Sequence, residues 1–167
     1  MNIPPETLEW WASMDVPPAT EKEVARVERA IGQPLPADYV RFLRQHGFVE
    51  WDIDTPDSFD YSVREEGQVV THTDGSISHL WDADHIERMA ADVRAPGGTP
   101  PLLYPNTHFP IGGTPDQDQI LMELTPKAGR IWYWPERVDE WGSGDNTALG
   151  FVADDFTTFV ENLRLGD

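Results

Sequence analysis

The segment between residues 20 and 47 constrains the fold most strongly, because it encodes two amphipathic helices joined by a short extended linker. Thr20 and Glu23 have the spacing of a capping box, in which each side chain bonds a backbone donor at the start of a helix. Apolar residues then recur at helical spacing up to Ile31, and Gly32 is suited to the left-handed conformation that ends a helix. The segment therefore predicts a helix over residues 21–31.

The linker that follows contains Pro34 and Pro36, which favour an extended backbone around Leu35 and place that side chain for burial. A second helix is predicted after Pro36 and before Gly47. Its apolar residues fall on one side, so they are expected in the same core as the first helix: Tyr39, Val40, Phe42 and Leu43.

Length and hydrophobic content predict one domain. The chain has 167 residues, of which 39% are hydrophobic, so it is long enough to bury a core of its own. We expect a single domain over residues 1–167, in which residues 1–19 form a helical extension. Leu8 and Trp11 lie on the apolar side of that extension, which Pro17 and Pro18 end.

The charge balance excludes some classes of partner. Twelve Lys and Arg residues stand against 30 Asp and Glu residues, which gives a formal net charge of -18. Direct binding of nucleic acid is not expected, because phosphate contacts need cations, whereas a basic protein partner is favoured. The chain has no cysteine and no long apolar run, and its first residues do not resemble a signal peptide. We therefore expect a cytoplasmic protein that does not associate with membranes; the oligomeric state is open, with a monomer favoured.

Turn signals and periodicity predict further elements after residue 67. Asp74 and Gly75 suit a tight hairpin turn, so residues 68–73 and 76–80 are expected to form paired strands. A helix is predicted from Asp82 or Asp84 to residue 93, before the Pro and Gly run at 96–101. Strands at 109–112, 119–124, 130–134 and 149–153 and a last helix, capped by Asp154 or Asp155, complete an α+β pattern.

Acidic and aromatic residues alternate in two segments. The first contains Glu50, Asp52, Asp54, Asp57 and Asp60, without any Lys or Arg, and carries Trp51, Phe59 and Tyr61. Charge repulsion and turn-forming residues predict a loop or an irregular edge strand there. The second segment contains Glu136, Asp139, Glu140 and Trp141.

The order of the elements resembles the SUKH superfamily of Smi/Knr-like domains. The likeness covers residues 20–165 and is weakest over residues 50–101. It lies in the order of a capped helix that ends in Gly, a Leu-Pro pair, an aromatic helix, three later strands and a closing helix. The first half of this pattern is carried by Thr20, Glu23, Val27, Ile31, Gly32, Leu35, Pro36, Tyr39, Phe42, Leu43 and Gly47. The second half is carried by residues 109–112, 119–124 and 131–134, Asp154, Asp155, Phe156, Phe159 and Leu163. One departure is the turn at 112–118, which is longer than that of the family and contains Pro115.

The resemblance implies an α+β fold with a mixed, largely antiparallel sheet of about five to six strands against about four helices. It also implies a non-enzymatic, protein-binding role without a cofactor. Bacterial members include immunity proteins that neutralise a cognate toxin, such as a nuclease, and fungal relatives act as regulatory scaffolds. We therefore expect a toxin partner with a basic surface, with a scaffold that recruits cellular proteins as the alternative.

The two acidic segments are the predicted partner-binding residues, because carboxylates complement a basic cleft and aromatic residues anchor a contact. These residues are Glu50, Trp51, Asp52, Asp54, Asp57, Glu136, Asp139, Glu140 and Trp141. The alternative is that Trp51, Phe59 and Tyr61 pack in the core and that the acids are a solvated rim.

Metal binding and catalysis are the weaker hypotheses. His79, Asp82 and His85 have a spacing that could supply ligands, but they straddle a predicted strand end and a helix start. Asp116 and Asp118 lack the closing Glu of a calcium loop. The chain contains no nucleophile motif or phosphate-binding motif. We therefore expect no metal, no catalytic residue and no enzymatic activity.

Overall fold

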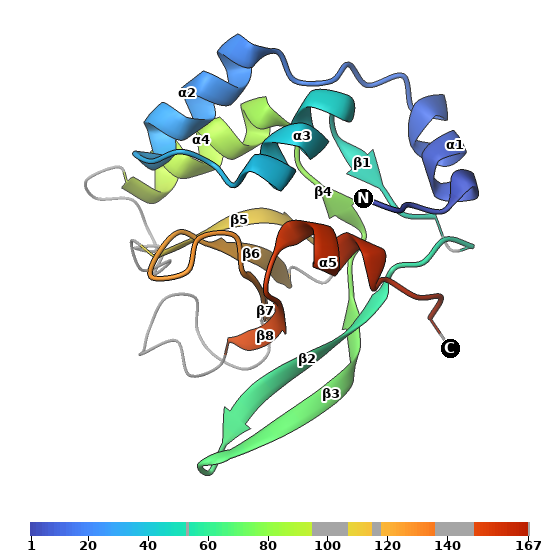
Figure 1. Cartoon of the computed structure of the whole chain (residues 1–167), viewed down its shortest axis with the longest axis vertical. Helices are drawn as coiled ribbons and strands as arrows, with labels where there is room; N and C mark the ends of the chain where they lie inside the picture. Colours follow the sequence, from blue (N-terminus) through green and yellow to red (C-terminus); the bar gives the residue numbers. More distant parts are fainter. Residues whose placement is uncertain (53, 95–106, 115–117, 136–148, 167) are drawn as a thin grey trace.

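The computed structural model describes residues 1–52, 54–94, 107–114, 118–135 and 149–166 (Figure 1). Over these ranges the chain forms five helices and one sheet of eight strands, which confirms the predicted α+β class. The sheet has more strands than the five or six expected. All of its pairings are antiparallel, so it is not mixed within the described ranges.

The helices are α1 (Pro5–Ser13), α2 (Glu21–Ile31), α3 (Ala37–Gln45), α4 (Ala83–Arg94) and α5 (Phe156–Glu161). The strands are β1 (Val49–Glu50), β2 (Ser58–Glu65), β3 (Gln68–Ser76), β4 (His79–Leu80), β5 (His108–Gly113), β6 (Gln119–Glu123), β7 (Ile131–Trp134) and β8 (Gly150–Ala153). The sheet order is β1-β4-β5-β6-β7-β8-β2-β3.

The helix ends follow the capping chemistry of the sequence. The Thr20 hydroxyl accepts a bond from the Glu23 amide, and the Glu23 carboxylate accepts one from the Thr20 amide, so the capping box is complete. Gly32 ends α2 at a φ of 88°, in the left-handed region. Asp82 accepts from the His85 amide at 2.7 Å and begins α4, and Asp155 caps α5. These predictions are confirmed.

The main core lies between the helices and one face of the sheet. Figure 1 shows α2, α3 and α4 together on that side. Tyr39, Phe42 and Leu43 of α3 are fully buried, and the ring centroids of Tyr39 and Phe42 lie 4.8 and 4.9 Å from that of Phe156 in α5. Burial of such side chains stabilises a fold by about 1.5–3 kcal/mol each. The apolar stripe of α3 is therefore used for the core.

Alternation on β6 and β7 divides their side chains between two faces, as predicted. Ile120, Met122, Ile131 and Tyr133 belong to the main core. On the other face, Leu121, Trp134 and Leu149 form a second small cluster, against which Trp132 packs. Both faces of the middle of the sheet are therefore covered.

A single long hairpin supplies strands at both ends of the sheet. Residues 49–50 pair with 79–80, and residues 58–65 pair with 68–76, in the same antiparallel sense. Only Ile77 and Ser78 separate β3 from β4, whereas residues 51–57 separate β1 from β2. The acidic segment is therefore an excursion in the middle of one hairpin arm. In Figure 1 the β2–β3 part of the hairpin projects away from the helices.

The predicted turn at Asp74 and Gly75 is wrong. β3 continues through both residues, and the chain turns at Glu66 and Gly67, whose φ values of 47° and 84° are those of a tight hairpin turn with two positive φ residues. Gly75 has another role, since it pairs with Phe59 and a Cβ added there would lie 2.5 Å from that ring. Close packing, and not turn geometry, thus requires glycine at position 75.

Candidate protein-binding site

The acidic segment is fixed at both ends by backbone hydrogen bonds. The Trp51 amide donates to the Ser78 carbonyl at 2.9 Å, and the Ile77 amide donates to the Asp57 carbonyl at 2.9 Å. Between these two bonds the chain leaves the hairpin and returns to it. We call residues 51–57 the acidic bulge. The pairing of the strands on either side therefore fixes where the acidic bulge begins and ends.

Thr55 fixes the interior of the acidic bulge. Its amide and its hydroxyl both donate to the Asp52 carbonyl, at 2.9 and 2.7 Å, and the residue is only 6% exposed. Asp52 and Asp54, which both precede Thr55 in this turn, are exposed. The bulge therefore turns its threonine inward and presents two of its acidic residues to solvent.

The N-terminal extension is attached to the acidic bulge through Glu50. The indole N–H groups of Trp10 and Trp11, in α1, both donate to the Glu50 carbonyl at 3.0 Å. Glu50 itself is exposed, and Trp51 contacts the Trp11 ring edge-on with centroids 5.1 Å apart. Because the contact to Glu50 is made through its backbone, α1 supports the start of the bulge without using the carboxylate.

The predicted site residues differ in their surroundings. Glu50, Asp52 and Asp54 are exposed, whereas Asp57 is half-buried and accepts a hydrogen bond from the Ser58 hydroxyl at 2.9 Å. Trp51 is half-buried against the core. Within the first acidic segment the structure thus exposes Glu50, Asp52 and Asp54 and buries part of Asp57. Glu136, Asp139, Glu140 and Trp141 lie outside the described residues.

Two of the aromatic residues in the first acidic segment belong to the core, as the alternative interpretation held. Phe59 is 2% exposed and Tyr61 is 4% exposed, and both contact the Tyr133 ring, with centroids 5.3 and 4.8 Å away. Among Trp51, Phe59 and Tyr61, only Trp51 retains partial exposure. It is therefore the one of the three that can serve as an aromatic anchor for a partner.

Several basic side chains elsewhere in the fold are engaged in ion pairs. Arg26 pairs with Asp84 and Glu87, Arg44 with Glu21, Arg130 with Asp154 and Arg164 with Asp60. The sequence has no Lys or Arg between residues 45 and 63. The carboxylates of the acidic bulge therefore contribute to the excess of negative charge, a property that favours cationic partners.

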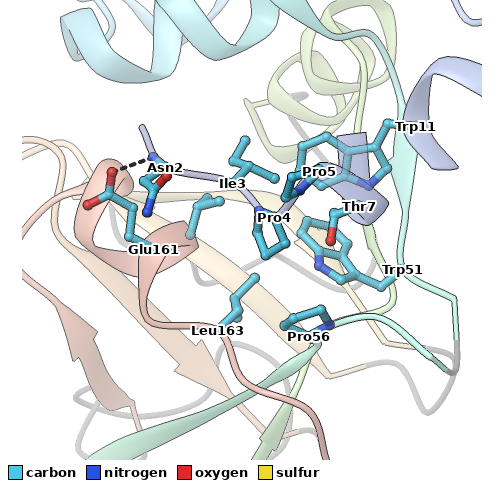
Figure 2. Close-up of a pocket in the computed structure, with 11 residues that line it drawn as sticks. Asn2, Ile3, Pro4, Pro5, Thr7, Trp11, Trp51, Pro56, Glu161 and Leu163 are labelled. Carbon is cyan, nitrogen blue, oxygen red and sulfur yellow. Dashed lines mark hydrogen bonds between the residues drawn. The ribbon is translucent and has the colours of Figure 1, made fainter. Parts of the chain in front are cut away.

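A pocket beside the acidic bulge was not predicted from the sequence. It has a volume of about 270 Å³ and lies between the N-terminal extension, the bulge and the end of α5 (Figure 2). Three parts of the chain line it: residues 2–5, Thr7 and Trp11; Trp51 and Pro56; and Val160, Glu161 and Leu163. The prolines at 4 and 5 and Trp11 are visible in the sequence, but periodicity predicts only that the extension packs.

One buried polar atom lies in the wall of the pocket. Thr7 is 2% exposed, and its Oγ1 has no hydrogen-bond partner in the part of the chain that the structure describes. A buried polar atom without a partner costs about 1–3 kcal/mol. Glu161 lies at the opposite side of the pocket, where its Oε1 accepts from the Asn2 amide at 2.5 Å (Figure 2).

The histidine pair at β4 and α4 has local structural roles. Asp82 is the cap of α4, and the His85 ring stacks on Trp81 with centroids 4.5 Å apart. Burial, and then the neighbouring His85, lower the pKa of His79 below its ordinary value. Within the described ranges, no three His, Asp or Glu side chains are placed to hold a metal ion.

Ser78 and His79 form the one described Ser-His contact beside the bulge, with the Ser78 Oγ 2.9 Å from the His79 Nδ1. The Ser78 hydroxyl also donates to the Gly113 carbonyl at 3.0 Å. These two contacts join the start of β4 to β5.

The fold and the exposed acidic bulge define an α+β protein with a surface suited to a protein partner. A family model described as the SMI1 / KNR4 family (SUKH-1) matches residues 18–162. The chain belongs to this family, which confirms the resemblance seen at residues 20–165. A comparison with curated proteins finds no match. In the described part of the chain, none of the helices has the length and apolar character needed to cross a membrane.

Proposed function

We propose that this chain is a non-enzymatic, cytoplasmic immunity protein that binds a cognate bacterial toxin and blocks its active surface. Membership of the SUKH-1 family supports a protein-binding module. The observation that carries the proposal is the acidic bulge with the residue before it, since Glu50, Asp52 and Asp54 are exposed beside the half-buried Trp51. A toxin that acts on nucleic acid needs cations at its substrate site, and these carboxylates complement such a surface.

The fixed backbone of the bulge supports binding by occlusion. Two hydrogen bonds at its ends and the Thr55 turn fix the backbone that carries Asp52 and Asp54 before a partner arrives. Such preorganisation lowers the entropy lost on binding. Charge at this surface is expected to act mainly on the association rate, because it steers the encounter of the two proteins. Trp51 would contribute to slow dissociation, because aromatic residues are common among the residues that dominate interface energies.

The test uses the toxin encoded beside this chain. Calorimetry at low and high salt measures affinity, and stopped-flow fluorescence measures the association rate. The Asp52→Lys/Asp54→Lys variant is expected to associate at least about tenfold more slowly at low ionic strength. Glu65→Lys/Glu66→Lys, at the tip of the projecting hairpin, makes the same change in net charge and is expected to have a smaller effect, because salt screens distant charges.

Two results would contradict the proposal in different ways. Unchanged rate and affinity in the Asp52→Lys/Asp54→Lys variant would place the interface away from the acidic bulge. Absence of binding to every neighbouring gene product would contradict toxin neutralisation itself. Specific capture of cellular proteins by a chain from an isolated locus would then favour the regulatory scaffold.

A further inference from the structure

The pocket between α1, the acidic bulge and α5 has the size of a side-chain site. Its volume of about 270 Å³ is below the range of roughly 300–1,000 Å³ that is typical of small-molecule and cofactor sites. Trp11 and Trp51 provide aromatic walls, and Pro4, Pro5 and Pro56 provide rigid apolar ones (Figure 2). Such a pocket fits one or two side chains of a partner protein and is too small for a large cofactor.

The unpaired Thr7 hydroxyl distinguishes this pocket from an apolar packing defect. A purely aliphatic occupant would leave the Oγ1 without a partner, so the cost of burying that atom would persist. A threonine hydroxyl can both accept and donate, so an occupant with a polar group at its end would supply the missing hydrogen bond. The pocket therefore favours a side chain that is apolar along its length and polar at its tip.

The charges around the pocket select a cation among such side chains. Glu161 lines the pocket, Asp52 follows Trp51 directly, and no Lys or Arg is among the described lining residues. The Glu161 Oε1 bonds the Asn2 amide and lies 3.6 Å from the Met1 amino group, while its Oε2 makes no hydrogen bond within the described ranges. Basic side chains pack their methylene groups on apolar surface and place their heads against aromatic rings and carboxylates.

We propose that this pocket receives a lysine or arginine side chain of the protein partner. The methylene groups pack between the prolines and the two indoles, and the charged head donates to the Thr7 Oγ1, while the Glu161 carboxylate across the pocket attracts it through space. The inference rests on the proposed function for the identity of the partner as a basic protein. It adds a specific anchor to the long-range attraction of the acidic bulge, since the pocket shares Trp51 with it.

The pocket is tested without any toxin, by titrating the full chain with N-acetyl-arginine amide and following the indole N–H signals by NMR. The expected result is a saturable shift of the Trp11 and Trp51 signals, with a much smaller shift from the neutral N-acetyl-norleucine amide. Thr7→Val keeps the side-chain shape but removes the acceptor, and is expected to weaken binding about tenfold. Glu161→Gln is expected to weaken it as well.

The controls separate a specific site from general attraction to an acidic protein. Thr73→Val makes the same chemical change at an exposed position of β3 and is expected to leave binding unchanged. Thr7→Val is expected to melt at the same or a higher temperature, because the lost hydroxyl has no partner in the described structure. Equal shifts from the arginine and norleucine amides, or equal affinity in Thr7→Val, would overturn the proposal.

Failure of the pocket and failure of the proposed function give different results. A toxin that binds the wild type and Thr7→Val equally would remove the pocket from the interface while leaving toxin neutralisation intact. Arginine amide bound at Trp11 and Trp51 in a chain that binds no toxin would support the pocket and contradict the immunity role.

Discussion

The two helices of residues 20–47 and the acidic bulge of residues 51–57 are neighbours in sequence but are stabilised in opposite ways. In the helices, side chains buried in the core or capping the ends make the stabilising contacts, as those of Phe42 and Thr20 do. In the bulge, backbone hydrogen bonds and the Thr55 hydroxyl make such contacts, and Asp52 and Asp54 are exposed. The difference indicates that the first region sets the stability of the fold and that the second is available for a partner.

The largest expected effect is in the helical region. Phe42→Ala removes a fully buried ring that contacts Phe156 and Trp11, with centroids 4.9 and 5.8 Å away, and is expected to lower the free energy of unfolding by about 3–5 kcal/mol. Asp54→Ala is expected to change it by no more than about 0.5 kcal/mol. Urea unfolding measures both, and similar losses in the two variants would contradict the comparison.

A smaller effect is expected at Thr55, whose side chain fixes the bulge from inside. Thr55→Val keeps the shape of the residue but removes the hydroxyl that donates to the Asp52 carbonyl at 2.7 Å. We expect a loss of about 1 kcal/mol and faster hydrogen exchange of the Thr55 amide. Thr73→Val, on an exposed threonine, is the matched control. An unchanged exchange rate in Thr55→Val would mean that the flanking strands alone hold the bulge.

The smallest expected effect is on the pH dependence of stability, through His46 at the end of α3. Burial lowers the pKa of His46 below its ordinary value, and its ring contacts Phe42 and Trp11. The unfolded chain therefore binds the proton more readily, so this contribution to stability is complete above the unfolded pKa of about 6.5 and is lost as the pH falls through the lower folded value.

Substitution of His46 by Gln measures this contribution. The slope of unfolding free energy against pH, just below pH 6.5, is expected to be shallower in His46→Gln than in the wild type. The comparison between the two chains removes the effect of the carboxylates, which are present in both. Equal slopes would show that His46 does not titrate differently on folding.

Sequence-based prediction succeeded where local patterns determine the structure, as in the helices, and failed where tertiary contacts do. Helices α2, α3, α4 and α5 and strands β5 to β8 were predicted, because caps and apolar periodicity are local properties that the sequence displays. The turn at Glu66 and Gly67 was missed, since Asp74 and Gly75 fit a turn locally and only the packing of Phe59 shows why glycine stands there. The position of the hairpin turn is therefore determined by tertiary contacts and not by the local sequence.

The candidate site was predicted in part for the same physical reason. Charge and aromatic content identify residues 50–57, but they do not give the Thr55 turn or the Ser78 bond that determine which of these residues are exposed. The pocket could not be predicted, because it joins residues 2–5 to residues 160–163 across the whole length of the chain. No local pattern records such a contact.

The backbone attachment of the bulge has a consequence for how such a protein can diversify. The Trp51 and Ile77 amides donate to backbone carbonyls, so these bonds do not involve the exposed side chain at position 54. Substitutions at that position can therefore occur with little loss of folding stability, and each one alters the charge pattern offered to a partner. A lineage with this architecture could follow a changing protein partner by exchanging exposed residues while its helices and sheet stay the same.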